Sequence, residues 1–340
     1  MDRVKVSLLG LGRAGTFHMQ SIGLLDDIQL AAVYDLDNAK AERVAEQFGC
    51  VAAKSPEEAI DRSEVDAVIV ATPTNAHFEF SKLAIKAGKP LLTEKPLGRS
   101  LSEIDTCFEL ATAAKTPLLV AFQRRFDPSF ASLIEAVKRG DVGQTHFIRS
   151  VSRDNPVPTM DYLKISGGMY HDCMVHDLDM VATLAQSEVT HVSAFGTSFI
   201  AGIGEMDDHD SVVGTLKFAN GVTASIDINR QSAYGYDQRI EVFGDGGMLQ
   251  ADNQYQSTVS HATKSGFSRP PIDYSFPTRY REAYREELAC FVRCVRGEEG
   301  VPITHTDVRT NHLLAVGMEV AARECRVVKF EEIEALAAAH

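Results

Sequence analysis

The first constraint on the fold is a glycine-rich turn that directly follows a short apolar segment. Residues Val4–Leu9 are mostly apolar and predict a strand, and the next six residues read GLGRAG. In such a turn the first glycine permits tight bending, the second allows another group to approach the backbone, and the third lets the next helix pack on the strand. The pattern therefore predicts a strand, a turn and a helix in immediate succession rather than an ordinary surface turn.

An acidic residue follows this turn at an informative spacing. Asp35 ends the second predicted strand, Gln29–Tyr34, and lies twenty residues after Gly15. The N–H groups at the start of a helix suit a pyrophosphate, and a carboxylate at the second strand accepts ribose hydroxyls and repels the 2′-phosphate of NADP. The next three residues include no Arg or Lys to offset the charge of Asp35. We therefore predict NAD as the cofactor, bound by Gly10, Gly12, Arg13, Ala14, Gly15 and Asp35.

The 340 residues fall into two regions of different pattern. In residues 1–122, short continuous apolar segments alternate with predicted helices, which is typical of a doubly wound parallel sheet with both faces buried. In residues 123–340, predicted strands separated by turns dominate, which indicates a mainly antiparallel sheet. We expect an α/β protein whose N-terminal domain, 1–122, binds the dinucleotide and whose C-terminal α+β domain, 123–340, binds the substrate.

The expected elements are as follows. In the first region the predicted strands are Val4–Leu9, Gln29–Tyr34, Ala67–Thr72, Pro90–Thr93 and Pro117–Phe122. In the second region the predicted strands are His191–Phe199, Ser211–Phe218, Val222–Arg230 and Arg239–Phe243, and Asp252–Pro277 is expected to be an edge strand plus a loop. The predicted helices there are Pro128–Lys138, Met169–Ala185, Tyr280–Arg296 and Asp307–Glu324.

Composition and charge exclude several classes of partner and location. The formal net charge of -13 argues against nucleic acid or an anionic membrane as a main partner. No apolar run approaches the roughly 20 residues of a membrane span, and the first residues lack a signal-peptide pattern, so we expect a cytoplasmic protein. Of the six cysteines only Cys290 and Cys294 are close in sequence. A metal there needs two further ligands that the sequence does not identify, so we interpret them as buried free thiols and expect no metal.

Polar residues follow two of the predicted strands of the first region. Thr72, Thr74 and His77 come after one strand, and Glu94 and Lys95 come at the end of the next. The carboxyl ends of parallel strands line the crevice in which open α/β sheets bind ligands. For Thr74 a helix N-cap is an equally good interpretation, and for Lys95 an ordinary surface lysine is as well supported by position alone.

The segment Met169–Met180 is the densest polar cluster within an otherwise apolar predicted helix. Asp172 and His176 are four residues apart and would share one helix face with Asp179. Histidine titrates near neutral pH and suits general-base work on an alcohol, and a neighbouring carboxylate fixes its tautomer. A metal site that includes His171 and a simple polar helix face are the two alternatives, and we favour the acid–base pair.

The order of these motifs resembles the glucose–fructose oxidoreductase/inositol dehydrogenase (Gfo/Idh/MocA) family. The resemblance rests on the glycine turn, Asp35, the Glu94-Lys95-Pro96 run and a Gly-Gly segment followed by Asp-x-x-x-His-Asp-x-Asp, and it covers Val4 to about Phe330. It implies an N-terminal Rossmann domain, a C-terminal domain with a large open sheet, and a homo-oligomer, either a dimer or a tetramer. The implied catalytic residues are Lys95, Asp172 and His176, and the implied cofactor contacts extend to Thr72, Thr74, His77, Glu94, Lys95 and Gln123.

Within the family the chain is most similar to the myo-inositol 2-dehydrogenases. This resemblance implies oxidation of a cyclic polyol, such as myo-inositol to 2-keto-myo-inositol, with substrate contacts at Arg125, Asn155 and Tyr236. Two features depart from the expected pattern: the Asp154-Asn155-Pro156 run is one residue longer, and His171 stands beside Asp172. A dehydrogenase of another sugar, an NAD-dependent glycosidase and a non-catalytic NAD-sensing regulator on the same fold are the alternatives.

Overall fold

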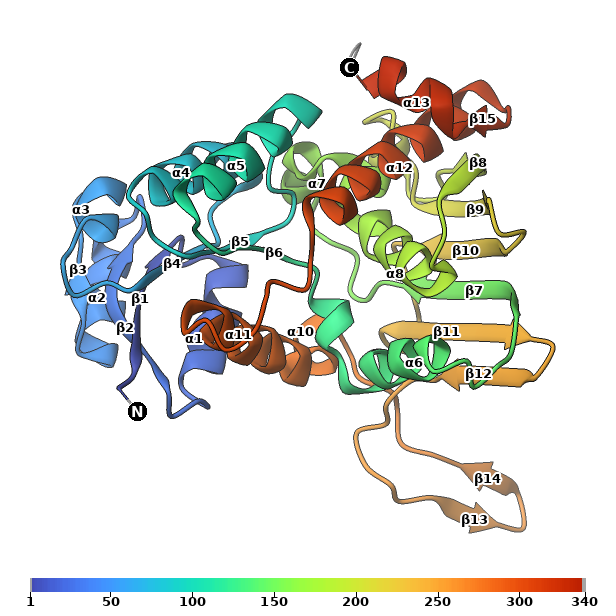
Figure 1. Cartoon of the computed structure of the whole chain (residues 1–340). Coiled ribbons are helices and arrows are strands. Elements are labelled where there is room, and N and C mark those ends of the chain that lie inside the picture. The colour runs from blue at the N-terminus through green and yellow to red at the C-terminus, as the bar shows by residue number, and fades with distance from the viewer. Residues whose placement is uncertain (1, 338–340) are drawn as a thin grey trace. The chain divides into compact units, whose positions relative to one another are not determined.

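The computed structural model describes residues 2–337 and divides them into two compact units (Figure 1). The first unit contains the residues up to 126 together with 281–310, and the second contains 127–280 together with the residues from 311 onward. The division into functional domains at residue 122 stays a prediction. The structure shows in addition that a late segment of the chain, residues 281–310, belongs to the same compact unit as the N-terminal residues.

The first unit is built on a six-stranded parallel sheet. Its strand order, β3-β2-β1-β4-β5-β6, is the doubly wound order of dinucleotide-binding folds and confirms the predicted fold class. Every residue of β4 and β5 is buried, as continuous apolar segments in a parallel sheet require. The strands are β1 Val4–Leu9, β2 Ile28–Tyr34, β3 Val51–Ala52, β4 Ala67–Val70, β5 Leu91–Glu94 and β6 Leu118–Ala121.

Helices cover this sheet, and two of them begin at a capping serine. The Ser55 hydroxyl accepts a hydrogen bond from Glu58 N at 3.1 Å, and the Ser100 hydroxyl accepts one from Glu103 N at 3.3 Å. The helices are α1 Arg13–Ile22, α2 Asn38–Phe48, α3 Pro56–Ile60, α4 Thr74–Lys86, α5 Leu101–Ala114, the short 3-10 helix η1 Gln123–Phe126 and α11 Arg281–Val295. Helix α11 packs against α1 and adds Leu288 and Phe291 to the core of this unit.

The second unit contains a seven-stranded mixed sheet in the order β12-β11-β7-β10-β9-β8-β15. All neighbouring pairs are antiparallel except β7 and β10, which are parallel. The strands are β7 Thr145–Arg153, β8 Val189–Thr197, β9 Ser211–Phe218, β10 Thr223–Asn229, β11 Asp237–Gly244, β12 Gly247–Ala251 and β15 Val328–Lys329. A separate hairpin, β13 His261–Thr263 and β14 Gly266–Ser268, extends from this unit (Figure 1).

Side chains on the two faces of this sheet differ in burial. Helix α8 packs on β7, and alternate residues of β9, such as Val212 and Leu216, are buried. On the opposite face Phe195 and Val213 are paired across β8 and β9 and are 69% and 54% exposed. The sheet therefore keeps an exposed face with large apolar side chains, as the open sheet predicted for this region requires.

The helices of the second unit include one departure from the prediction. They are α6 Pro128–Lys138, α7 Met160–Ser166, α8 Val175–Ala185, α9 Ala201–Gly204, α10 Phe276–Arg279, α12 His305–Glu324, of which the last fourteen residues belong here, and α13 Phe330–Ala337. The single α-helix predicted over Met169–Ala185 is wrong in its first part, because Met169–Met174 forms a π-helix, η2, before α8 begins. No helix within residues 2–337 is long and apolar enough to span a bilayer.

Candidate active site

The glycine turn has the geometry that its three glycines predict. A Cβ on Gly10, where φ is +92°, would lie 2.5 Å from the Ala71 carbonyl oxygen, and one on Gly15 would lie 2.1 Å from the Gly10 carbonyl oxygen. These two positions therefore require glycine for packing. A Cβ on Gly12, the N-cap of α1, would meet no heavy atom within 4 Å. The second glycine thus faces open space at a helix N-terminus, which fits a cofactor pyrophosphate.

The Asp35 carboxylate is fixed directly beside this turn. Its Oδ2 accepts a hydrogen bond from Leu11 N at 2.8 Å, and its Oδ1 accepts one from Asp37 N at 3.0 Å. The first bond connects the end of β2 to the glycine turn, and the two bonds together orient the carboxylate. An oriented, partly exposed carboxylate in this position fits the ribose hydroxyls of NAD.

His77 connects the loops that follow β4 and β5. Its Nδ1 lies 2.8 Å from the Pro96 carbonyl oxygen and its Nε2 lies 2.7 Å from the Thr72 carbonyl oxygen. Burial lowers the pKa of His77, although both carbonyl contacts act in the other direction. Both ring nitrogens therefore face backbone carbonyls, and the side chain holds the two strand ends together. The Thr72 hydroxyl is buried and has no hydrogen-bond partner among the described residues, so it remains able to bond a ligand.

The Glu94 carboxylate contacts a buried histidine of helix α1. Its Oε1 lies 2.9 Å from His18 Nε2, and His18 is fully buried in α1. Burial alone would raise the pKa of Glu94, but the hydrogen bond and charge of His18 hold it below the ordinary value. This contact ties α1 to the end of β5, next to Lys95. The Lys95–Pro96 peptide bond is cis.

A second buried carboxyl group lies in the same unit and was not predicted. Glu287 of α11 is fully buried, and neither of its carboxylate oxygens has a hydrogen-bond partner among residues 2–337. Burial, and then the negative charge of Glu94, raise the pKa of Glu287 well above its ordinary value. Both effects favour the neutral, protonated form of the Glu287 carboxyl group. The sequence carries no signal for this, because Glu287 lies in a run of charged residues that resembles an exposed helix face.

Of the two predicted contacts in η1, one is buried and the other is ion-paired. Gln123 is 5% exposed. Arg125 Nη2 lies 3.2 Å from Asp307 Oδ1, and Asp307 belongs to the same unit. Burial alone would raise the pKa of Asp307, but the charge of Arg125 and the hydrogen bonds from Thr304 together hold it below its ordinary value, which favours an ionised pair. The assignment of Arg125 to the substrate stays a prediction, and the Asp307 contact is one that the sequence did not reveal.

In the second unit Asp172 lies within the π-helix η2 and is held by two side chains. The Tyr162 hydroxyl donates to Asp172 Oδ1 at 2.9 Å, and Arg230 Nη1 donates to Asp172 Oδ2 at 3.2 Å. Arg230 is 1% exposed, and its guanidinium is therefore a buried positive charge. π-helices are rare and are frequent at functional sites, because the wider turn re-aims the side chains that it carries. Asp172 is thus strongly oriented, by residues that the sequence did not single out.

The other polar residues of this segment point to different neighbours. His176 lies in the first turn of α8 and is half-buried. His171 Nε2 lies 3.1 Å from Glu319 Oε2, so its ring contacts α12 rather than the partners of Asp172. The hydrogen bond from His171 helps to lower the pKa of Glu319 to about 2. Asp177 is fully buried and accepts hydrogen bonds from Ser150 and Ser152, both at 2.6 Å.

The two remaining predicted substrate contacts lie near the loop before α10. Asn155 Nδ2 donates to the Tyr274 carbonyl oxygen at 2.8 Å, and Tyr236 N donates to the Asp273 carbonyl oxygen at 2.8 Å. The Tyr236 ring is 8% exposed and meets Tyr280 edge-on, with centroids 5.9 Å apart. Both residues are thus anchored to one loop, and their contact with a substrate stays a prediction.

Comparison with known proteins identifies the family. Residues 4–122 match the family described as an oxidoreductase family with an NAD-binding Rossmann fold, and residues 130–250 match the Gfo/Idh/MocA C-terminal domain. The chain belongs to the Gfo/Idh/MocA oxidoreductase family. A myo-inositol 2-dehydrogenase of Thermotoga maritima is 37% identical over 97% of this chain and 99% of that protein. An inositol 2-dehydrogenase of Rhizobium meliloti is 37% identical over 88% of this chain and 91% of that protein.

The solved structures agree with this assignment. The crystal structure of a probable dehydrogenase from Thermotoga maritima matches with a TM-score of 0.94 and 37% identity, and covers 97% of this chain and 99% of that one. This member of the Gfo/Idh/MocA family is thus an NAD-dependent dehydrogenase, as predicted from the glycine turn and Asp35.

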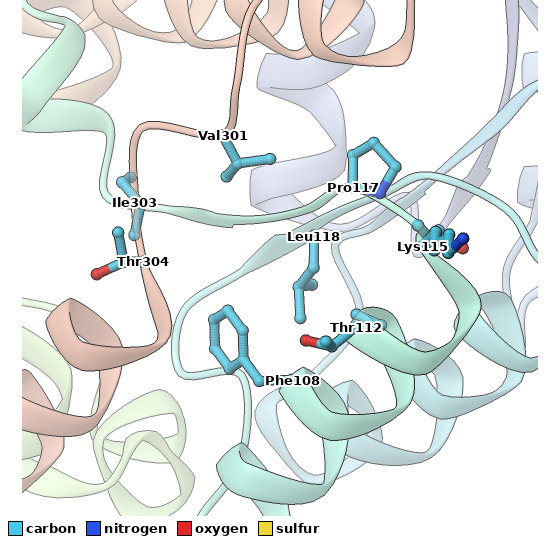
Figure 2. Close-up of a pocket in the computed structure, with 10 residues that line it drawn as sticks. Phe108, Thr112, Lys115, Pro117, Leu118, Val301, Ile303 and Thr304 are labelled. Carbon is cyan, nitrogen blue, oxygen red and sulfur yellow. The ribbon is translucent and has the colours of Figure 1, made fainter. Parts of the chain in front are cut away.

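A pocket in the first unit of this oxidoreductase lies outside the predicted site. Its volume is about 350 Å³, and it lies between the end of α5, the start of β6 and residues 301–304 (Figure 2). Figure 2 shows Phe108 and Leu118 pointing into it beside Ile303. None of the residues predicted to bind NAD lines this pocket, so we assign it no part in the reaction.

Proposed function

We propose that the chain oxidises one secondary hydroxyl of a cyclic polyol to a ketone, and that the substrate is myo-inositol and the product 2-keto-myo-inositol. The observation that carries this proposal is the 37% identity to two proteins named as inositol 2-dehydrogenases, one of them over 97% of this chain. The residues that the reaction needs are present in the matching order: Lys95, Asp172 and His176.

In the proposed mechanism His176 accepts the proton of the hydroxyl group as a general base. Asp172, itself fixed by Tyr162 and Arg230, orients the imidazole and stabilises its charged form. Lys95 hydrogen-bonds the same oxygen and stabilises its developing negative charge. The hydride from the carbinol carbon passes to bound NAD, which supplies the redox chemistry.

NAD is held in this proposal by the glycine turn, Asp35 and the neighbouring strand ends. Gly12 leaves space for the pyrophosphate, and Asp35 accepts the ribose hydroxyls. Thr72, Thr74, His77, Glu94, Lys95 and Gln123 complete the proposed cofactor contacts, and Arg125, Asn155 and Tyr236 select the substrate by hydrogen bonds. Such contacts discriminate strongly between substrates, because a substrate that lacks the hydroxyl leaves a buried polar group of the protein unpaired.

A substrate panel tests the proposal. The purified protein is incubated with NAD and, in turn, myo-inositol, scyllo-inositol, glucose and an aryl glycoside, and NADH formation is followed by absorbance. We expect the highest kcat/KM with myo-inositol. Scyllo-inositol is the substrate named for a Bacillus subtilis relative that is 32% identical. A higher kcat/KM with scyllo-inositol would assign a different inositol stereoisomer as the substrate but keep the proposed substrate class. A higher value with glucose, or aglycone release without net NADH, would refute the proposed reaction.

We also propose that the protein is a cytoplasmic homotetramer assembled through the exposed face of the seven-stranded sheet. Phe147 and Phe243 stack across β7 and β11 with ring centroids 6.4 Å apart, and both are exposed. Phe195 and Val213 form a second exposed apolar pair, and a hollow of about 450 Å³ lies on the same strands. Exposed apolar patches of this kind mark association surfaces, and the six free cysteines fit a reducing compartment.

Sedimentation velocity tests the assembly. We expect the wild type to sediment as a tetramer, and Phe195→Glu to shift it toward smaller species because a charge replaces an exposed apolar side chain of the sheet. Leu24→Glu, which changes an exposed leucine of the first unit, is the matched control. A 37.2 kDa species alone for the wild type at micromolar concentration would refute the proposal.

A further inference from the structure

Three potential metal ligands gather at the C-terminal end of α11. The sulfur atoms of Cys290 and Cys294 and a carboxylate oxygen of Glu299 lie within 4.8 Å of one another. Both thiols are free and almost completely buried, at 4% and 3% exposure, whereas Glu299 is exposed. None of the three has a part in the proposed reaction. Glu299 is thus a potential third ligand, which the sequence analysis did not identify beside the two cysteines.

The chain that brings Glu299 back to the helix is held by a regular capping turn. Gly297, with φ of +71°, donates its N–H to the Cys294 carbonyl oxygen at 3.1 Å. Glu298 N donates to the Arg293 carbonyl oxygen at 2.9 Å. These two bonds are the Schellman pattern, which ends a helix and reverses the chain over its last turn. The backbone that leads to Glu299 is therefore held against the end of α11 by hydrogen bonds.

The spacing suits a bound cation better than a disulfide. A tetrahedral Zn²⁺ with bonds of about 2.3 Å to sulfur and about 2.1 Å to oxygen separates its ligand atoms by roughly 3.6–3.8 Å. A disulfide needs Cβ atoms about 3.5–4.5 Å apart, whereas residues four apart on a helix keep theirs about 5–6 Å apart. A cation can thus join the two sulfur atoms with the helix intact, and a covalent bond cannot.

Ligand chemistry and charge select the class of cation. Thiolates bind soft or borderline metals and disfavour Mg²⁺ and Ca²⁺. Two thiolates and one carboxylate carry three negative charges, and Arg293 adds one positive charge, because its Nε donates to Glu299 Oε2 at 2.9 Å. A divalent cation therefore makes the cluster neutral.

We propose that Cys290, Cys294 and Glu299 bind one thiophilic divalent cation of the zinc type. Water is the fourth ligand, since the carboxylate lies at the surface. Binding displaces the two thiol protons and joins the end of α11 to the turn that follows it. The cation stabilises the first unit, and it has no role in the redox step.

The test uses the full-length protein, reduced and freed of metal by dialysis against a chelator. Cys325→Ser serves as the parent, because Cys325 is the exposed thiol and would bind metal on its own. Cd²⁺ is the probe, since its thiolate complexes absorb in the ultraviolet, and Zn²⁺ is added as competitor. We expect one Cd²⁺ per chain, displaced by Zn²⁺, and a Zn²⁺-dependent rise in the thermal unfolding midpoint. The absence of saturable binding in the parent would overturn the proposal.

Matched variants assign the site. Cys294→Ser should abolish the cadmium band, whereas Cys107→Ser, which changes another buried thiol of the same unit, should leave it unchanged. Glu299→Gln should weaken binding at least about tenfold, and Glu298→Gln, its exposed neighbour, should not. Equal affinity in these two glutamine variants, or an unchanged band in Cys294→Ser, would overturn the assignment. If Cys294→Ser fails to fold, the comparison of cadmium affinity between Glu299→Gln and Glu298→Gln decides whether the assignment stands.

Discussion

Asp35 should determine the choice between NAD and NADP, by an amount that follows from its charge. At about 4 Å and an effective dielectric constant of about 20, its carboxylate repels each unit charge of a 2′-phosphate by about 4 kcal/mol. Solvent and relaxation reduce this energy because Asp35 is only partly buried. We therefore expect kcat/KM to be on the order of 10²-fold higher with NAD, which corresponds to about 2.7 kcal/mol.

Two substitutions separate the charge of Asp35 from its structural contacts. Asp35→Asn removes the charge but keeps one oxygen acceptor for Leu11 N or Asp37 N. Asp35→Ser removes the charge and both carboxylate hydrogen bonds, including the one that Leu11 N of the turn donates. We expect both variants to bring the ratio of kcat/KM values to within about tenfold, because the repulsion is lost in each. Only Asp35→Ser should also lower kcat/KM markedly with both cofactors, because the glycine turn loosens.

The assay is initial-rate NADH or NADPH formation from myo-inositol at two ionic strengths. Salt screens charges that are exposed to solvent, so higher ionic strength should narrow the wild-type ratio and leave that of Asp35→Asn nearly unchanged. Equal kcat/KM with NAD and NADP in the wild type would refute the assignment of Asp35. A ratio that stays wide in Asp35→Asn would show that shape, and not charge, sets the preference.

Three further predictions concern catalysis and stability. His176→Ala should lower kcat by roughly 10²–10⁴-fold, while the Kd for NAD, measured by fluorescence titration, stays the same. Full activity of this variant would exclude His176 as the general base. Glu287 has a pKa raised first by burial and then by Glu94, so the wild type should lose stability as pH rises above about 4.5, and Glu287→Gln should abolish that loss in urea unfolding. Burial alone would raise the pKa of Asp237, but hydrogen bonds, the largest from Arg239, lower it to about 2. Asp237→Asn should therefore cost about 2 kcal/mol at pH 7, a difference that shrinks as pH falls from about 4 toward 2, and equal urea midpoints at pH 7 would contradict it.

The sequence predicted the elements whose side chains follow a simple burial pattern. The bounds of β1 and α6 are those predicted, because a mostly apolar strand before a glycine turn and a helix that starts with proline after an Asp cap are strong local signals. Strand β7 was missed although it lies in the middle of its sheet. Two of its buried residues are Ser150 and Ser152, which are satisfied by Asp177, so a central strand looks polar in sequence.

The candidate site shows the same limit. The proposed site residues were named from short motifs, but the groups that hold them in place could not be predicted in this way. Tyr162 and Arg230 orient Asp172 from ten and fifty-eight residues away in sequence, and His18 holds Glu94 across seventy-six residues. Such partners are set by tertiary packing, which no local pattern encodes. The π-helix that carries Asp172 was also missed, because hydrophobic spacing does not distinguish it from an α-helix.

The return of residues 281–310 to the first unit has a consequence for synthesis on the ribosome. Leu288, Phe291 and Val292 of α11, together with Ile303 and Val308, complete a core otherwise built from the first 122 residues. At about 5–20 residues per second, the ribosome needs roughly 10–30 s to pass from residue 126 to α11. During that interval the nascent nucleotide-binding unit exposes the apolar surface that α11 later covers. Chaperone contact with the emerging chain should therefore persist until α11 leaves the exit tunnel, long after the sheet of this unit has been made.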